Sequence, residues 1–345
     1  MPLVESIRAT IRAQGPRSFA WFMQQALYHP EHGYYSSGRC TIGRKGDYFT
    51  NVSVGPLFGQ LLAVQFAEIW ERLDKINNFV IVEQGAHDGQ FARDVLEFLQ
   101  ENLPEFFDAL AYRIVEPFPM LEEQQRRRLE VFGNKIEWRR CPQPFVGVHF
   151  SNELLDAMPI RLISDDTEKL VDLRGDKLVF VERPAGKMIA NEAALELIDE
   201  IAASLQRGYV IAIDYGHTDE DFQRNVQIRA RHRHLDSPLD SIGEADITMS
   251  VDWRSITECA RANGLRIAGF TDQHHFLTGI LSQFPDGDLL GDSKANRELK
   301  TLLHPEMMGR AFQVVALTKN VNPEIDPLMG FKFARRLDQS GRSKM

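Results

Sequence analysis

The residues best suited to chemistry begin at a glycine turn. Residues 79–82 form a short apolar run without a polar break, which is typical of a strand buried on both faces of a parallel sheet. The run ends in Glu83, and Gly85 and Gly89 bracket a tight turn before apolar residues recur at helical spacing. Such a turn lets backbone approach a ligand closely and points the free N–H groups of a helix start at an anionic group. The alternative is a plain glycine turn of an α/β protein.

Further polar side chains follow other predicted strands. They are Glu116 after residues 112–115, Asn152, Glu153 and Asp156 after residues 146–150, and Asp214 after residues 209–213. Because ligands in open α/β sheets bind at the carboxyl ends of strands, we expect these side chains to line one crevice. A carboxylate after the second strand can accept two hydrogen bonds from a ribose cis-diol, so Glu116 is the predicted ribose ligand. The alternatives are a solvent-facing Glu116 and, after residue 150, side chains that cap the next turn while Glu153 lies in solvent.

The elements that must position these residues are short apolar strands alternating with helices. The predicted strands cover residues 79–82, 112–115, 136–138, 146–150, 209–213, 265–270 and 311–318. Helices are predicted between the early strands, which indicates an α/β fold. Residues 160–183 alternate around turn residues and predict a small inserted set of antiparallel hairpins. The run from Arg126 to Arg128 lies on a predicted helix and is expected to be a solvated face.

Composition limits the class of ligand. The 345 residues carry 40 Lys and Arg against 49 Asp and Glu, a net charge of −9, which argues against broad binding of a nucleic-acid backbone. The Arg- and His-rich stretch from residue 224 to residue 234 lacks interleaved aromatic residues and a third positioned ligand, so neither a nucleic-acid patch nor a metal site is predicted there. The three cysteines form no C-x-x-C pair, so no thiolate zinc site or disulfide framework is expected and a reducing compartment fits.

Hydropathy bears on location. No apolar run approaches the roughly 20 residues that span a bilayer, so no membrane partner is expected. Residues 1–18 lack the apolar core of a secretory signal, and Leu3, Ile7 and Ile11 form the apolar stripe of an ordinary helix rather than a mitochondrial presequence. We therefore expect a cytoplasmic, bacterial protein in preference to a mitochondrial one.

The spacing of the glycine turn separates two classes of cofactor. The dinucleotide fingerprint G-x-G-x-x-G fails at two of its three glycines, because His87 and Gln90 stand at those positions. A nicotinamide oxidoreductase is therefore disfavoured. The stretch from Glu83 to Gly89 instead resembles the E-x-G-x-G-x-G motif of class I S-adenosylmethionine-dependent methyltransferases, with His87 in the place of the middle glycine.

Five separated motifs resemble, in the correct order, those of the MidA family, which includes a mitochondrial complex I assembly factor with protein-arginine methyltransferase activity. The matching positions are Gly33-Tyr34-Tyr35 with Gly46-Asp47-Tyr48-Phe49-Thr50 and Phe58-Gly59, then Asn152-Glu153 with Asp156-Ala157 and Pro159, then Asp214-Tyr215-Gly216, then Ile228-Arg229-Ala230 with Asp246-Ile247-Thr248 and Val251-Asp252-Trp253, and finally Leu302, Pro305, Met308-Gly309 and Phe312. The family pattern T-S-P-E-x-S is altered after Thr50, where Ser53 and Gly55 replace its glutamate and its second serine.

The resemblance implies a class I methyltransferase fold with a seven-stranded, Rossmann-like sheet whose last strand is antiparallel. It divides the chain into a helical N-terminal cap with a glycine-rich loop (1–77), a methyltransferase domain (78–319) with insertions at 160–190 and 217–250, and a loosely attached C-terminal tail (320–345). It also implies S-adenosyl-L-methionine as the cofactor. The residues expected to bind it are Glu83, Gly85, His87, Gly89, Glu116 and Thr50.

The implied activity is N-methylation of an arginine in a protein substrate. Methyl transfer chiefly requires the acceptor atom to be held close to the methyl group at the correct angle. A guanidinium is a planar fork of donors, so carboxylates can orient it and stabilise charge as its proton departs. Glu153 and Asp156, with Asn152 and Asp214, are therefore the expected catalytic residues. The alternative is an inactive scaffold or assembly factor that kept the fold, because His87 stands in the glycine turn and the loop after Thr50 is altered.

Overall fold

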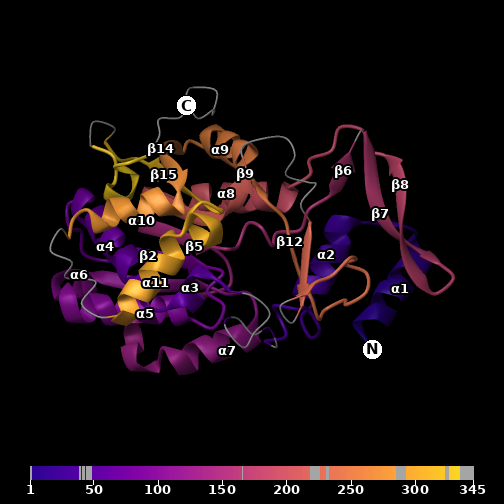
Figure 1. Ribbon diagram of the computed structural model, residues 1–345, viewed down its shortest axis with the longest axis horizontal. Helices are drawn as coiled ribbons and strands as arrows, with labels where there is room; N and C mark the ends of the chain where they lie inside the picture. Colours follow the sequence, from indigo (N-terminus) through magenta and orange to yellow (C-terminus); the bar gives the residue numbers. More distant parts are fainter. Residues whose placement is uncertain are drawn as a thin grey trace.

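The computed structural model describes residues 2–38, 40, 43, 49–164, 166–217, 226–230, 233–284, 293–322 and 326–334, and its largest element is a sheet with the strand order β14-β15-β9-β5-β2-β3-β4 (Figure 1). These strands are β2 (Phe79–Gln84), β3 (Leu110–Val115), β4 (Ile136–Arg139), β5 (Phe145–Asn152), β9 (Leu205–His217), β14 (Arg266–Asp272) and β15 (Phe312–Lys319). Neighbours are parallel except at β15, which runs antiparallel to both β9 and β14. The predicted α/β fold with an antiparallel last strand is confirmed.

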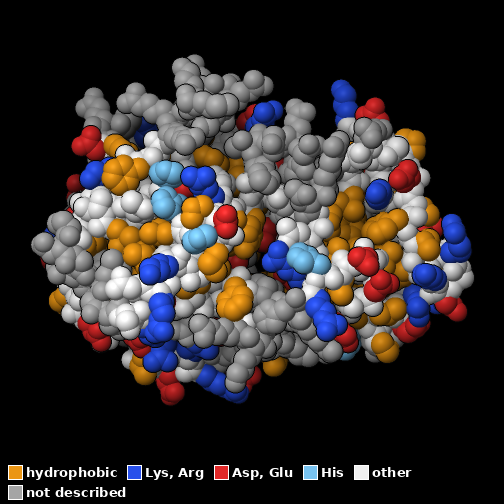
Figure 2. All heavy atoms as spheres, in the orientation of Figure 1, with side chains coloured by type: hydrophobic (Ala, Val, Ile, Leu, Met, Phe, Trp, Pro, Cys, Tyr) orange, Lys and Arg blue, Asp and Glu red, His pale blue; other side chains and the backbone are white. Residues whose placement is uncertain are grey.

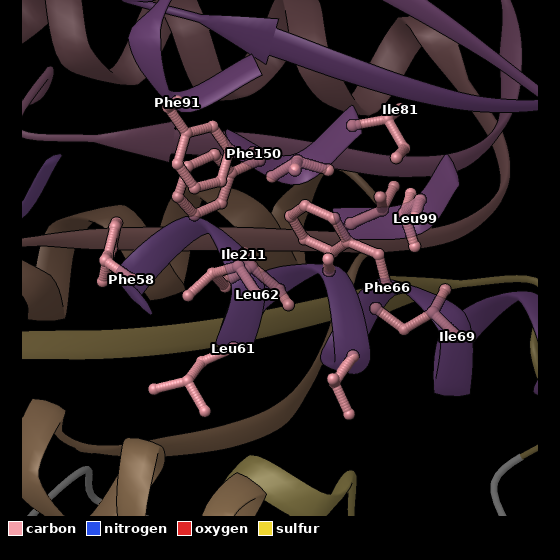
Figure 3. Close-up of a cluster of buried hydrophobic side chains, with 14 of the residues drawn as sticks. Phe58, Leu61, Leu62, Phe66, Ile69, Ile81, Phe91, Leu99, Phe150 and Ile211 are labelled. Carbon is pink, nitrogen blue, oxygen red and sulfur yellow. The ribbon is translucent and has the colours of Figure 1, made fainter. Parts of the chain in front are cut away.

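Helices cover both faces of this central sheet. They are α4 (Leu57–Arg72), α5 (Gln90–Asn102) and α10 (Gln273–Leu281) on one face, and α8 (Glu192–Ser204) and α9 (Trp253–Ala262) on the other. Successive residues of β2 alternate between the two cores, with Ile81 in the first and Val82 in the second. In the first core the rings of Phe66, Phe91 and Phe150 pack together (Figure 3). Burial on both faces explains why β2 reads as an unbroken apolar run.

A second, smaller sheet joins residues that are far apart in the chain. Its strands are β1 (Arg17–Ser18), β6 (Leu162–Ser164), β7 (Thr167–Arg174) and β8 (Lys177–Pro184), and the other three pair antiparallel with β7. The helices α1 (Leu3–Gln14) and α2 (Phe19–Tyr28) share its core (Figure 1). The predicted hairpin set is therefore present. Residues 1–77 contribute to both parts of the molecule, because α1 and α2 pack here while α4 packs on the central sheet.

The predicted insertion at 217–250 contains a three-stranded antiparallel sheet, here called the insert sheet. It consists of β10 (Gln227–Ala230), β11 (Arg233–His234) and β12 (Asp246–Thr248). Ile247 and Met249 are buried in the core of α1 and α2, and β13 (Val251–Asp252) then pairs in parallel with the end of β9. The insert sheet thus connects the two parts of the molecule. Predictions made for residues 46–48, 224, 231 and 232 lie outside the described residues.

The remaining helices and the chain end pack around these sheets. They include α3 (Asn51–Val54), α6 (Pro104–Ala109), α7 (Pro119–Arg128) and α11 (Ser293–Leu303). Near the C-terminus, Leu328 and Phe331 are buried in the core of α4 and α10, and the Gly330 N–H donates to Gln65 Oε1 at 3.0 Å. Residues 326–334 are therefore not a loose tail. Within the described part of the chain, every helix is too short or too polar to cross a membrane.

We predict that Phe331→Ala lowers the free energy of unfolding by about 3–5 kcal/mol, because it removes a ring from a closed core. Phe331 is only 3% exposed, whereas Phe333, two residues further on, is 43% exposed. Phe333→Ala is the matched control and should change the free energy of unfolding by no more than about 0.5 kcal/mol. Chemical denaturation of the two variants checks this, and equal losses would contradict the docked arrangement of residues 326–334.

Candidate active site

A cavity of about 1010 Å³ lies at the carboxyl ends of β2, β3 and β5. Its wall is completed by residues before α3 and by the insert sheet, and the surface is hollowed between the two parts of the molecule (Figure 2). Eight of the ten predicted site residues line it: Thr50, Glu83, Gly85, His87, Glu116, Asn152, Glu153 and Asp156. Gly89 and Asp214 are buried behind that wall. The parallel topology therefore gathers the predicted residues as expected.

The glycine turn forms one end of the cavity with its backbone in the left-handed region. The φ angles are 82° at Gly85, 46° at His87 and 83° at Gly89. A Cβ on residue 85 would lie 3.2 Å from Leu154 Cδ1, so glycine also allows the turn after β5 to approach. The Gly89 N–H donates to Ala86 O at 2.8 Å, which closes the turn before α5 begins.

His87 lies beside Asp88 in this turn, with its Nδ1 3.7 Å from Asp88 Oδ1. Burial disfavours the charged imidazole, but the interactions with Asp88 and Cys40 outweigh that effect and raise the pKa of His87 to about 10. Asp88 also accepts from Arg128 Nη2 at 2.7 Å, and Arg128 lines the cavity. The prediction of a solvated face is therefore wrong for Arg128. A turn with a protonated imidazole and a helix start suits an anionic ligand group.

Two buried glutamates lie at the carboxyl ends of β2 and β3, Glu83 within the last two residues of β2 and Glu116 directly after β3. Tyr112 Oη donates to Glu83 Oε2 at 2.7 Å, and burial raises the pKa of Glu83 to about 8. Glu116 accepts from the Phe118 N–H at 3.0 Å and from Gln125 Nε2 at 2.8 Å. Burial also raises the pKa of Glu116 above its ordinary value. Both side chains are fixed in position and can still accept hydrogen bonds from a ligand in the cavity.

Asp214 holds the turn at the other end of the cavity. Its Oδ2 accepts from the N–H groups of Leu154, Leu155 and Asp156 at 3.0, 2.7 and 3.2 Å. Its Oδ1 accepts from the N–H of the next residue in β9 at 2.8 Å. The Glu153 N–H donates to a β9 carbonyl, and Glu153 has a φ of 53°. A carboxylate with four backbone donors, buried behind the wall, is suited to positioning the turn rather than to touching a ligand.

Glu153 and Asp156 are presented to the cavity by that turn. Glu153 Oε1 accepts from the Asn51 N–H at 3.0 Å and from Asn152 Nδ2 at 2.8 Å, so Glu153 is not simply in solvent. Burial raises the pKa of Glu153 to about 8. Burial, and then the nearby charges of Asp214, Asp246 and Glu153, raise the pKa of Asp156 well above its usual range.

Thr50 lines the cavity and also caps a short helix. Its Oγ1 accepts from the Ser53 N–H at 3.1 Å, and Ser53 Oγ accepts from the Thr50 N–H at 2.9 Å. This reciprocal pair caps α3. The same loop supplies the Asn51 N–H to Glu153, so the altered loop sequence still contacts the predicted site.

Three residues in or next to the cavity wall, Gln125, Tyr35 and Asp246, make contacts that the sequence did not predict. Gln125 donates to both Glu116 and the His87 carbonyl, and thereby ties α7 to the glycine turn. Tyr35 and Asp246 line the cavity and are joined by a 2.6 Å hydrogen bond from Tyr35 Oη to Asp246 Oδ1. The G-Y-Y motif that contains Tyr35 and the D-I-T motif that begins with Asp246 are the sequence features that could have indicated these two residues. Among the described residues, no group of three or more His, Cys, Asp or Glu is arranged to hold a metal ion.

Comparison with known proteins shows the family of this chain. The profile of a family described as "Putative S-adenosyl-L-methionine-dependent methyltransferase" matches residues 61–271. The Drosophila melanogaster protein named "Protein arginine methyltransferase NDUFAF7 homolog, mitochondrial" is 26% identical, with 95% of this chain and 88% of that protein covered. The human protein arginine methyltransferase NDUFAF7 is also 26% identical, with 98% and 87% covered.

A solved structure from Burkholderia thailandensis has the same fold over nearly the whole chain. It is 27% identical, the TM-score is 0.82, and 97% of this chain and 95% of that chain are covered. It was solved with bound S-adenosyl-homocysteine. A second structure of a protein from the same organism has a TM-score of 0.81 at 25% identity. The predicted class I fold and the predicted cofactor, S-adenosyl-L-methionine, are thereby confirmed.

We predict that Glu116→Gln weakens binding of S-adenosyl-homocysteine by about 10-fold or more, the cost of replacing a charged acceptor with a neutral one. Titration calorimetry measures the change. Glu122→Gln is the control, because Glu122 lies on α7 outside the cavity wall, where it accepts a hydrogen bond from Arg126. Equal affinities of Glu116→Gln and the wild-type protein would remove Glu116 from the cofactor site.

Proposed function

The chain belongs to this family of S-adenosyl-L-methionine-dependent methyltransferases, and from that premise we propose that it methylates a guanidino nitrogen of arginine in a protein substrate. The observation that carries the proposal is the pair of carboxyl side chains, Glu153 and Asp156, held at the cavity wall by Asp214. The names of the relatives that are about 26% identical support the same acceptor.

The residues at the glycine-turn end suit the cofactor. Two glycines leave room for backbone contact, and the buried glutamates supply acceptors for hydroxyl and ammonium groups. We assign Glu116 to the ribose hydroxyls and Glu83 to the cationic part of the amino acid group. His87 and the start of α5 would hold its carboxylate, and Gly85, Gly89 and Thr50 would shape the wall. When bound, S-adenosyl-L-methionine supplies an electrophilic methyl carbon on a sulfonium sulfur.

The chain's own task in the reaction is to orient the acceptor and to take its proton. A carboxylate pair fits the N–H groups of a guanidinium and restricts it to one plane. As the attacking nitrogen gains its methyl group it must lose a proton, and Glu153 or Asp156 accepts it when ionised. Asn152 orients Glu153 through its Nδ2 donor, and Asp214 acts as a positioning residue.

An inactive scaffold is the second candidate. His87 in the glycine turn is the observation that favours it, since a side chain replaces the family's glycine there. However, His87 occupies only part of a cavity that remains about 1010 Å³, and its charge suits an anionic cofactor group. Glu153 also accepts two hydrogen bonds, one of them from Asn51 in the altered loop. These features favour the enzyme.

We predict that the purified protein transfers labelled methyl groups to arginine in a hypomethylated protein extract, and that Glu153→Gln lowers this rate about 100-fold or more. Acid hydrolysis followed by amino-acid analysis identifies the methylated residue. Because the variant keeps the glycine turn, its affinity for S-adenosyl-homocysteine should stay at the wild-type value.

The control is Glu196→Gln, an exposed change on α8 away from the cavity, which should retain full activity. Label on a residue other than arginine would overturn the acceptor assignment. Cofactor binding without any methyl transfer would favour the scaffold instead.

The rate should rise with pH. A carboxyl group accepts a proton only when it is ionised, and burial raises the pKa of Glu153 to about 8. We therefore predict that kcat increases from pH 6, is about half-maximal near pH 8 and levels off only above about pH 9, with a limb that belongs jointly to Glu153 and Asp156. Single-turnover rates between pH 6 and 9.5 measure it. A flat profile would exclude a carboxylate as the proton acceptor.

A further inference from the structure

Asp246 is a buried carboxylate that the proposed roles leave unused. It lies at the start of β12, is 3% exposed and lines the cavity. Tyr35 Oη donates to its Oδ1 at 2.6 Å. The Met249 N–H donates to the Asp156 carbonyl at 2.9 Å, which ties the end of the insert sheet to the turn after β5. The insertion thereby brings its own carboxylate to the same cavity.

The negative charge of Asp246 raises the pKa values of the acids already described. Its charge contributes to the raised pKa of both Asp156 and Glu153, so it lies within effective Coulombic range of both groups. It also contributes to the raised pKa of Tyr28 on α2. Like charges in a buried space repel one another, so a cationic ligand that enters this cavity lowers their repulsion.

A guanidinium has more than one edge of donors, and a carboxylate pair on one turn covers only one side of it. Resting on the function proposed above, we propose that Asp246 is a specificity-determining residue that binds the acceptor guanidinium from the insert sheet, opposite Glu153 and Asp156. A lysine ammonium is a compact point charge that does not need carboxylates on two sides. Asp246 would therefore select arginine over lysine.

The surrounding aromatic residues fit a planar cation. Tyr28 and Tyr35 both line the cavity, and their rings stack with centroids 5.7 Å apart and an interplanar angle of 24°. Tyr28 Oη donates to the Ala157 carbonyl at 3.0 Å, and Tyr35 is held by its bond to Asp246. Guanidinium planes stack readily on aromatic faces. Tyr28 also stacks on Phe118, with ring centroids 6.1 Å apart, so Tyr35 is the ring that we place beside the acceptor.

The titratable and charged groups that face Asp156 determine how its pKa responds to a change at Asp246. They come from its own turn (Glu153), from β9 (Asp214 and Tyr215), from α2 (Tyr28) and from the insert sheet (Asp246, with its cross-strand partner Arg229). Removing the Asp246 charge takes away a group that disfavours ionisation of Asp156, so the pKa of Asp156 should fall.

Asp246→Asn separates this role from a structural one. It should raise KM for an arginine peptide at least 10-fold, lower the preference for arginine over the matching lysine peptide, and shift the acid limb of the pH profile to lower pH. The affinity for S-adenosyl-homocysteine and the midpoint of thermal unfolding should not change. The matched control is Asp240→Asn, an exposed change in the same insertion, which should leave every value at that of the wild type.

Tyr35→Phe is the second variant, because it keeps the charge of Asp246 and removes the hydrogen bond that Tyr35 donates to it. It should raise KM less than Asp246→Asn and should not move the acid limb to lower pH. If the wild type methylates arginine and Asp246→Asn has an unchanged KM and pH profile, the inference about Asp246 is overturned while the proposed function stands. Loss of cofactor affinity or of stability in Asp246→Asn would also overturn it, in favour of a structural role. If the wild type methylates no arginine, both proposals fail.

Discussion

The end of the cavity that we propose for the acceptor depends on the carboxylate of Asp214. One of its oxygens receives three successive N–H groups, from Leu154, Leu155 and Asp156, and the other receives a fourth from β9. Burial raises the pKa of Asp214 to about 7, while the four donors favour its anion. Three consecutive donors can converge on one atom only if the chain wraps around it, and the wrap places Glu153 in the left-handed region. The positions of Glu153 and Asp156 follow from that turn.

Gln125 fixes the end of the cavity at the glycine turn, as Asp214 fixes the opposite end. Its Nε2 donates to both the Glu116 carboxylate and the His87 carbonyl at 2.8 Å, and its Oε1 accepts from Trp138 Nε1 at 3.0 Å. One fully buried amide thus joins the end of β3, the glycine turn and β4. Two buried polar residues therefore fix the two ends of a large cavity, and the ligand-facing side chains need little reorganisation when ligands bind.

The sequence was informative where its signal was local. The strand at residues 79–82 is a continuous apolar run because both of its faces are buried, and the acids follow strands that parallel pairing brings to one edge. The Tyr35–Asp246 bond joins residues 211 positions apart, and β1 is two residues long, so neither leaves a periodic signal. Arg128 looked like part of a charged helix face because its partner, Asp88, belongs to another element.

The altered loop after Thr50 shows how a departure from a family pattern can be absorbed. The family's second serine is replaced by Gly55, where any Cβ would overlap the carboxylate of Glu298 from α11. Glu298 Oε2 accepts the Leu57 N–H at 3.2 Å, so a side chain from α11 supplies an acceptor at the start of α4. Asn51 meanwhile provides its N–H to Glu153. The altered loop therefore makes its own local contacts and holds the carboxylate at the cavity, so the substitutions there do not argue for a loss of activity.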